Sequence, residues 1–229
     1  MASDSTHNPA SLTDANEIPH ARQVLVMALV TLAEQRKADS ESHILRVQHY
    51  VLALAQALAK QAAFADTLTP AYIDTLFLSV PLYDMGSIGI PDRILLKPMK
   101  LTPDEFEEIK THCQYGVDII GNHPADVTQM ARDIAYTHHE CWDGNGYPRG
   151  LRGEAIPIAG RITAIIDVYD ALTSSRPYKA AFSPNEALAM IREGAGSKFD
   201  PNLVANFLLI HDTLRQQLDA LGGDDSSAS

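Results

Sequence analysis

Apolar and polar residues alternate with a helical period along most of this chain of 229 residues. After Ser40, for example, the positions His43, Val47, Tyr50 and Leu54 recur at spacings of four, three and four, so their side chains share one helix face. No segment of useful length alternates at every second residue, and the chain has no internal repeat. The pattern therefore predicts an all-α fold of about eight helices.

Residues that favour helix starts place most of the expected boundaries. Thr69 is an N-cap residue followed by proline, and the segments that begin at Thr102 and Ser183 have the capping-box pattern. We expect helices over about 24–37, from about 40, from 70, from 103, over about 126–139, over about 157–173, from 184 and from 201.

Composition predicts one domain over residues 20–221. Residues 1–19 are rich in Ser, Asn, Pro and Asp and predict a flexible lead-in, and residues 222–229 predict a disordered tail. No apolar run approaches the roughly 18–20 residues of a membrane helix, and the start lacks a signal-peptide pattern. The two cysteines, Cys113 and Cys141, make no disulfide framework. These features predict a cytoplasmic protein without a membrane partner.

The acidic balance of the chain narrows the class of ligand. The formal net charge is −11 and the pI is about 5.1. Binding to a nucleic acid polymer needs a basic surface, so this class of partner is not expected. A small anionic ligand held by a few local Arg or Lys side chains stays compatible with the charge.

Polar side chains occupy positions where the helical pattern expects apolar ones. They occur on five of the expected helices and are His43, Asp84, His112, the pair His138 and His139, and Asp167. Any one of them alone is more often a satisfied core residue than a ligand. Their repetition favours a shared metal site, because buried charge needs a partner. Imidazole and carboxylate ligands suit Fe, Mn or Zn, and a bridging carboxylate suits a two-metal phosphoester site.

Two local patterns add to this picture. Asp167 is in phase with a stripe of small residues, Gly160, Ala164 and Ala171, which would let another segment approach closely. The pair His138-His139 leads directly into the turn-forming segment that ends at Pro148. Cys113 and Cys141 lie near these histidines and raise the alternative of a structural zinc site. That alternative is disfavoured, because Cys113 is rotated by about 100° from His112 and no short Cys-x-x-Cys pair occurs.

The order and spacing of these residues resemble the HD-GYP family, a bacterial branch of the HD-domain metal-dependent phosphohydrolases. The matching segments are residues 43–47, 90–98, 100–102, 110–112, 138–148, 153–157, 167–172, 176–179 and 199–201. The resemblance implies an HD-domain-like helical bundle that hydrolyses cyclic di-GMP. It also implies transition-metal ions, one or two per chain, with iron the expected ion and manganese or another divalent ion the alternative.

Carried over by position, the resemblance assigns a metal-binding role to six residues. They are His43, Asp84, His112, His138, His139 and Asp167. Asp84 would bridge two ions, and Asp84 and Asp167 would be the catalytic residues. Asp39, one turn before His43, stands where metal-rich members have Glu, so it is the candidate ligand of a third ion.

The resemblance also assigns substrate and partner contacts. Arg176 and Lys179 match phosphate-binding positions, Arg through its rigid fork and Lys as a point charge, and Tyr147 is a further substrate contact. Gly146, Tyr147 and Pro148 form the loop that names the family. A diguanylate cyclase (GGDEF) or a receiver-domain protein is the partner expected at this loop, and a homodimer is compatible with it.

The chain departs from the family at two positions of one motif. Where the family has Leu-His-Asp-Ile-Gly-Lys, this chain has Leu82 to Ser87, with Tyr83 replacing the histidine and Ser87 the lysine. An ordinary tyrosine ionises with a pKa of about 10, so Tyr83 is the weaker candidate ligand. Two hypotheses lead: a cyclic di-GMP phosphodiesterase of reduced activity, and a degenerate module that binds the ligand or a protein without turnover. A generic HD nucleotide phosphohydrolase comes third, because it would leave the Gly-Tyr-Pro loop unexplained.

Overall fold

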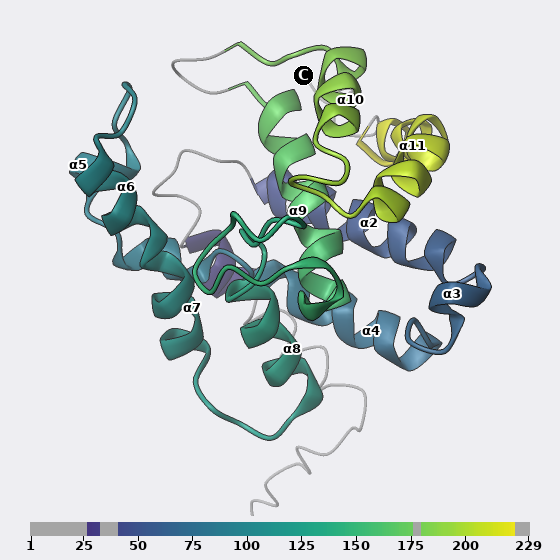
Figure 1. Cartoon of the computed structure of the whole chain (residues 1–229), viewed down its shortest axis with the longest axis horizontal. Coiled ribbons are helices and arrows are strands. Elements are labelled where there is room, and N and C mark those ends of the chain that lie inside the picture. The colour runs from purple at the N-terminus through teal and green to yellow at the C-terminus, as the bar shows by residue number, and fades with distance from the viewer. Residues whose placement is uncertain (1–26, 33–40, 176–179, 223–229) are drawn as a thin grey trace, which may run out of the picture.

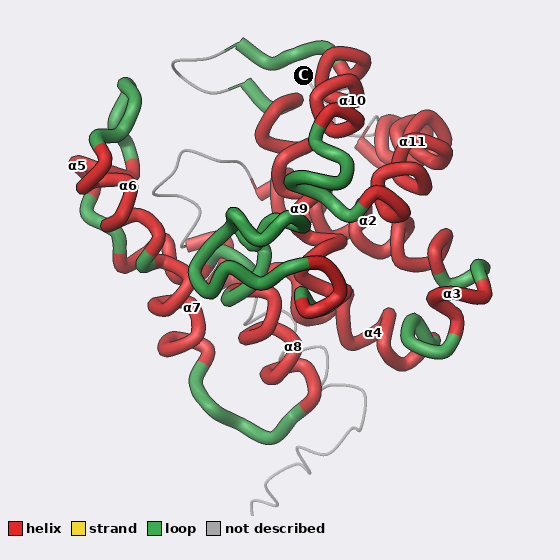
Figure 2. Tube along the Cα trace, in the orientation of Figure 1, coloured by secondary structure: helices red, strands yellow, loops and turns green. Residues whose placement is uncertain are grey.

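The computed structural model describes residues 27–32, 41–175 and 180–222. Within these ranges the chain forms helices and loops, apart from one isolated bridge between Ala195 and Phe199, which confirms the all-α prediction (Figures 1 and 2). The α-helices are α2 (Glu41–Leu58), α3 (Ala62–Ala65), α4 (Pro70–Ser79), α5 (Asp92–Leu95), α6 (Pro103–Lys110), α7 (His112–Ile120), α8 (Asp126–Ala135), α9 (Ile158–Thr173), α10 (Pro184–Glu193) and α11 (Pro201–Gly222). Three 3₁₀-helices, η2 (Val80–Leu82), η3 (Met85–Gly89) and η4 (Gly153–Ala155), complete the elements, and residues 27–32 are also helical.

Within the described residues, the helix starts that the sequence predicts are present, and the start expected at about residue 24 lies outside these residues. Thr102 caps α6 and Ser183 caps α10, each in a capping box whose two hydrogen bonds are formed. At the start of α4, the Thr69 side chain accepts a hydrogen bond from the Tyr72 N–H. These local interactions satisfy N–H groups that have no partner inside the helix, and so they set its first residue.

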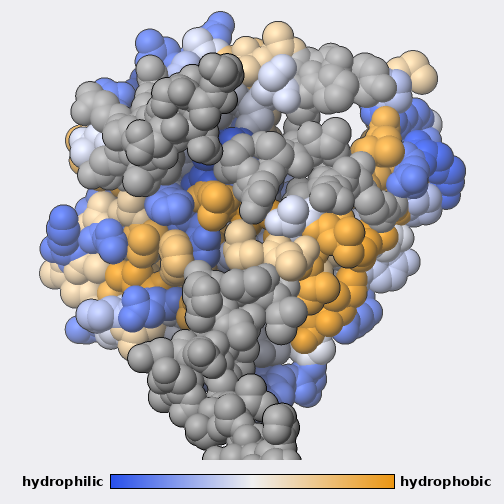
Figure 3. Space-filling model, turned by 180° about the vertical axis from the view of Figure 1, so that it is seen from behind, coloured by the Kyte–Doolittle hydropathy of each residue, from blue (hydrophilic) through white to orange (hydrophobic). Residues whose placement is uncertain are grey.

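The core lies between α2, α4, α9 and α11, with α9 near the middle of the molecule (Figure 1). Its helices bury apolar side chains completely, among them Leu54 of α2, Ile162 and Ile165 of α9, and Phe207 of α11. Each such side chain contributes about 1.5–3 kcal/mol of transfer free energy relative to water. The face shown in Figure 3 carries both apolar and hydrophilic side chains. Among the described helices, none has the length and hydropathy needed to cross a membrane.

Three expected helices end earlier than their periodicity predicts. Pro81 has no N–H and cannot continue α4, so the chain changes to η2 and Asp84 lies in a turn rather than on the helix face. The expected helix from 103 is divided at Thr111, whose hydroxyl donates to the Glu108 carbonyl at 2.6 Å. Helix α8 ends at Ala135, so His138 and His139 follow the helix instead of belonging to it.

Candidate metal centre

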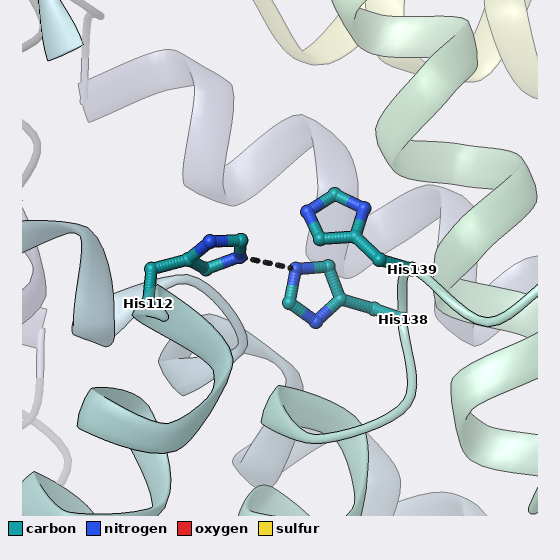
Figure 4. Close-up of side chains that lie close together, drawn as sticks. All are labelled: His112, His138 and His139. Carbon is teal, nitrogen blue, oxygen red and sulfur yellow. Dashed lines mark hydrogen bonds between the residues drawn. The ribbon is translucent and has the colours of Figure 1, made fainter. Parts of the chain in front are cut away.

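Three histidine side chains from two segments meet at one point, as Figure 4 shows. His112 is the first residue of α7, and His138 and His139 lie in the turn after α8. One ligand nitrogen from each ring can be chosen so that all lie within 4.8 Å of one another. We call this group the histidine trio. His112 and His138 are buried, and His139 is partly exposed.

Backbone carbonyls orient two of these rings. His112 Nδ1 lies 2.6 Å from the Ile109 carbonyl oxygen, and His138 Nδ1 lies 3.0 Å from that of Ile134. Because a carbonyl only accepts hydrogen bonds, both Nδ1 atoms carry the proton and donate it. In the neutral rings the two Nε2 atoms are therefore acceptors, and they face each other at 3.4 Å. Two facing lone pairs are unfavourable unless a cation lies between them.

The separation of these two nitrogens also suits a shared ion. Two ligands about 2.1 Å from one tetrahedral ion lie roughly 3.4 Å apart, and the Nε2 atoms of His112 and His138 have this spacing. Burial and the neighbouring His112 ring lower the pKa of His138. Burial and the neighbouring His138 ring hold the pKa of His139 well below its ordinary value. The His138 and His139 rings are therefore neutral at pH 7, which is the form of imidazole that binds metal.

Asp84 places a carboxylate beside the histidine trio. Its Oδ1 lies 3.7 Å from His112 Nε2. The turn that holds Asp84 packs tightly on α7, because a Cβ added at Gly86 would lie 1.9 Å from the His112 carbonyl oxygen and 2.4 Å from the Gly116 nitrogen. Only glycine fits at position 86 without moving backbone. The donor set of three imidazoles and one carboxylate suits Fe, Mn or Zn.

Two further predicted ligands, His43 and Asp167, meet through Tyr83. His43 Nε2 lies 3.1 Å from the Tyr83 hydroxyl oxygen, and this hydroxyl donates to Asp167 Oδ1 at 2.8 Å. The Tyr83 ring is 5% exposed and lies edge-on to the His138 ring, with centroids 5.3 Å apart. The ring of Tyr83 thus stands beside the histidine trio, with His43 and Asp167 joined to its hydroxyl.

Asp170 is a site residue to which the sequence analysis assigned no role. Its carboxylate lies 2.6 Å from His43 Nδ1 and accepts hydrogen bonds from Arg46 Nε at 2.7 Å and from the Ser174 hydroxyl at 3.1 Å. Burial alone would raise the pKa of Asp170, but the hydrogen bonds from His43 and Arg46 outweigh it and lower the pKa. A signal was present in the sequence, because Asp170 lies three residues after Asp167 and neighbours it on the helix surface.

The stripe of small residues on α9 has the effect expected from the sequence. A Cβ at Gly160 would lie 2.2 Å from the Thr137 Oγ1, so α9 contacts the turn that carries His138. Ala164, farther along the same helix, is buried.

A folded loop covers one side of the histidine trio. Its Tyr147 ring lies over the His139 ring, with centroids 4.8 Å apart, and the Tyr147 N–H donates to the His139 carbonyl at 3.2 Å. Glu140 closes the loop, because its carboxylate accepts the backbone N–H groups of Arg149 and Leu151. A Cβ at Gly146 would lie 2.2 Å from the Cys141 nitrogen, so the loop is tightly folded. Burial raises the pKa of Tyr147, which keeps its hydroxyl protonated.

Two further side chains near the histidine trio, Ser87 and Cys113, are buried. The Ser87 side chain is buried, and its Oγ has no hydrogen-bond partner among the described residues. The Cys113 thiol lies 3.6 Å from His112 Nε2, closer than its helical rotation predicted. Burial, with Asp84 and Glu140 nearby, raises the pKa of Cys113 to about 12. Among the described residues, the side chains close enough to share one ion are the three histidines and include neither cysteine, so the zinc alternative stays disfavoured.

Three of the predicted site residues, Asp39, Arg176 and Lys179, lie outside the described residues. Of the other predicted site residues, Asp84 lies beside the histidine trio. His43 and Asp167 are joined through the Tyr83 hydroxyl. Of the loop residues Gly146, Tyr147 and Pro148, Tyr147 contacts His139, and Gly146 packs against the backbone of Glu140 and Cys141.

Known proteins are similar to this chain over most of its length. A family model described as an HD domain matches residues 20–203. A cyclic di-GMP phosphodiesterase of Vibrio cholerae is 48% identical over 202 residues, which cover 86% of this chain and 41% of the relative. A probable cyclic di-GMP phosphodiesterase of the same organism is 45% identical over 204 residues, which cover 86% of this chain and 46% of the relative. This chain thus spans less than half the length of these two relatives.

A solved structure has the same fold. The crystal structure of a cyclic GMP-AMP-specific phosphodiesterase of V. cholerae superposes with a TM-score of 0.62 over 87% of this chain and 50% of that chain. The sequence identity is 22%, so the likeness concerns the fold, and it confirms the predicted HD-domain-like bundle.

Proposed function

This chain belongs to the HD domain family, and from that premise we propose that it is a metal-dependent phosphodiesterase of the HD-GYP type that acts on cyclic di-GMP. Two of its relatives are named for this substrate. The observation that carries the proposal is the histidine trio, in which the Nε2 acceptors of His112 and His138 face each other beside the Asp84 carboxylate.

We assign a separate role in such a site to each of the residues present. A divalent ion, when bound, would polarise the phosphoryl oxygens of the substrate and activate water for attack on phosphorus. The histidine trio and Asp84 would hold that ion, with iron the first expectation and manganese the second. Asp167 Oδ1 accepts a hydrogen bond from the Tyr83 hydroxyl and so orients it. The ring of Tyr147 shields His139 from one side.

The substrate would be oriented by cations beyond this centre. Arg176 and Lys179 supply positive charge in a chain whose net charge is −11. A guanidinium binds two phosphate oxygens at once, and an ammonium adds a point charge. The loop Gly146-Tyr147-Pro148 would serve as the contact for a diguanylate cyclase or a receiver-domain protein.

One observation favours a second candidate function, a cyclic di-GMP-binding module without turnover. Tyr83 occupies the place of a metal-ligating histidine, and Ser87, with a buried hydroxyl, occupies the place of a lysine. Loss of one group that stabilises transition-state charge commonly lowers the rate by about 10²–10³. The same fold would then bind cyclic di-GMP without hydrolysing it.

Anaerobic hydrolysis assays separate the two functions. Release of linear pGpG or GMP from cyclic di-GMP is measured with iron and with manganese for the parent, for His138→Ala, and for Tyr83→His combined with Ser87→Lys. We expect slow turnover by the parent and none by His138→Ala. The double variant should be at least about tenfold faster than the parent, because it regains a group that stabilises charge in the transition state. Cyclic GMP-AMP serves as the competing substrate.

The possible results assign the function directly. A silent parent that binds cyclic di-GMP, together with an active double variant, identifies the binding module. A parent that neither binds nor hydrolyses cyclic di-GMP contradicts both functions. If parent and double variant bind metal and ligand and both stay silent, the phosphodiesterase function is wrong.

A further inference from the structure

We infer that the Tyr83 hydroxyl closes one metal position, so that each chain binds a single ion at the histidine trio and none between His43 and Asp167. The inference rests on the proposed metal-dependent function and adds to it the number of ions. It follows from how two potential ligands of different helices converge on one hydroxyl oxygen.

The two potential ligand atoms point at the same atom. His43 Nε2 lies 3.1 Å and Asp167 Oδ1 lies 2.8 Å from the Tyr83 hydroxyl oxygen. Nitrogen and oxygen ligands bind zinc, for comparison, at about 2.0–2.2 Å. The hydroxyl oxygen therefore occupies the space in which an ion would contact both His43 and Asp167. A hydrogen-bonded oxygen takes the place of the ion there.

The surroundings hold this bridge in place from both ends. On one end, Asp170 lies 2.6 Å from His43 Nδ1, and Arg46 in turn donates to Asp170 through Nε and Nη2. The His43 ring cannot rotate without breaking this short, buried hydrogen bond. On the other end, Tyr83 is 5% exposed, and its backbone N–H donates to the Val80 carbonyl. Rotating it away would expose apolar surface and leave buried polar groups unpaired.

The chemistry of the bridge differs from that of the histidine trio. At this bridge the Tyr83 hydroxyl donates to Asp167 Oδ1 and lies beside His43 Nε2, so a hydroxyl group occupies the position between the two potential ligand atoms. In the histidine trio, by contrast, His112 and His138 donate from Nδ1 to backbone carbonyls and present Nε2 lone pairs to each other. One position is therefore prepared for a cation, and the other is filled by a hydroxyl group.

Metal titration of three variants tests the inference without an activity assay. Tyr83→Phe removes the hydroxyl and keeps the ring, Tyr83→His replaces it by a ligand, and Tyr115→Phe removes the hydroxyl of a tyrosine that is 41% exposed. Bound manganese and iron per chain are measured by elemental analysis after anaerobic loading. Electron paramagnetic resonance detects magnetic coupling between two neighbouring ions.

We expect one ion in the parent and in Tyr115→Phe, and two magnetically coupled ions in Tyr83→His. Tyr83→Phe should bind a second ion at least tenfold more tightly than the parent, because His43 and Asp167 are then no longer joined by the hydroxyl. Circular dichroism checks that each variant is folded. If Tyr83→His does not fold, the comparison of Tyr83→Phe with the parent decides alone.

The results that overturn the inference differ from those that overturn the proposed function. Two ions in the parent refute the closed position and leave the metal-dependent function standing. An unchanged second-ion affinity in Tyr83→Phe also refutes it, because the hydroxyl would then not be what excludes the ion. A folded parent that binds no ion refutes the metal-dependent function, and the single-ion count with it.

Discussion

Glu140 is the residue whose removal we expect to loosen the loop over the histidine trio. It is 3% exposed, and its carboxylate accepts the N–H groups of Arg149 at 2.8 Å and of Leu151 at 2.9 Å. A hydrogen bond to a charged group contributes about 1.5–3 kcal/mol. Both amides belong to a loop near the surface, where water replaces part of the lost interaction. We therefore take the lower value for each bond and expect Glu140→Ala to destabilise the closed loop by about 3 kcal/mol.

The loss should be local, because the core helices do not depend on this carboxylate. A change of about 3 kcal/mol corresponds to roughly a 100-fold increase in the population of the open loop. Hydrogen exchange measured by NMR should then become about 100-fold faster at the Arg149 and Leu151 amides. The amides of Ile162 and Ile165 in α9, which lie in the core, are the internal control.

Glu140→Gln is the matched variant. Its amide oxygen can accept one of the two N–H groups while its NH₂ group cannot, so we expect about half the loss in free energy and roughly tenfold faster exchange. Because the loop carries Tyr147 over His139, metal affinity should fall in the same order, with Glu140→Ala weaker than Glu140→Gln. Unchanged exchange in Glu140→Ala would refute the role of the carboxylate. Equal acceleration at Ile162 would show that the whole domain, not the loop, depends on it.

The remaining predictions concern the ion, the ligand, the pH and the packing. His138→Ala should abolish tight metal binding in elemental analysis. Full metal content in this variant would show that the histidine trio does not bind the ion. The pKa values of His138 and His139 lie below the ordinary value because of burial, so below about pH 6.5 the unfolded chain binds more protons than the folded one. The stability of the metal-free protein should therefore fall as the pH is lowered through 6.5, and a Tm that is equal at pH 7.5 and 5.5 would contradict this. Arg176→Ala or Lys179→Ala should weaken cyclic di-GMP binding at least tenfold in calorimetry with little change in Tm, and unchanged affinity would count against their phosphate contacts. Gly86→Ala places a Cβ 1.9 Å from the His112 carbonyl oxygen, so it should cost about 1–3 kcal/mol in urea unfolding and weaken metal binding, whereas wild-type stability would show that the turn can move.

The helical class and most helix starts were predictable because their causes are local. A capping box such as that at Thr102 is formed by residues three positions apart, and a helical period is a property of neighbours along the chain. Helix ends were less predictable. The periodicity carried the expected helices through Asp84 and His138, but Pro81 ends α4 and the chain leaves α8 after Ala135. Whether a helix continues depends on which carbonyls and side chains compete for its last hydrogen bonds.

Sequence alone also selected His112, His138 and His139, which are polar where the pattern expects apolar side chains and which lie close together in the structure. It did not show that Tyr83 joins His43 to Asp167.

The contacts of Asp170 were not predictable from the sequence either, because its partners His43 and Arg46 lie 127 and 124 residues away in the chain. Periodicity tells which face of a helix a side chain occupies, but not which atom of a distant segment it will meet. Those pairings depend on close contacts between backbones, such as that of Gly86 with α7 and that of Gly160 with Thr137. Only the packed tertiary structure sets these contacts, and with them the atom that a distant side chain faces.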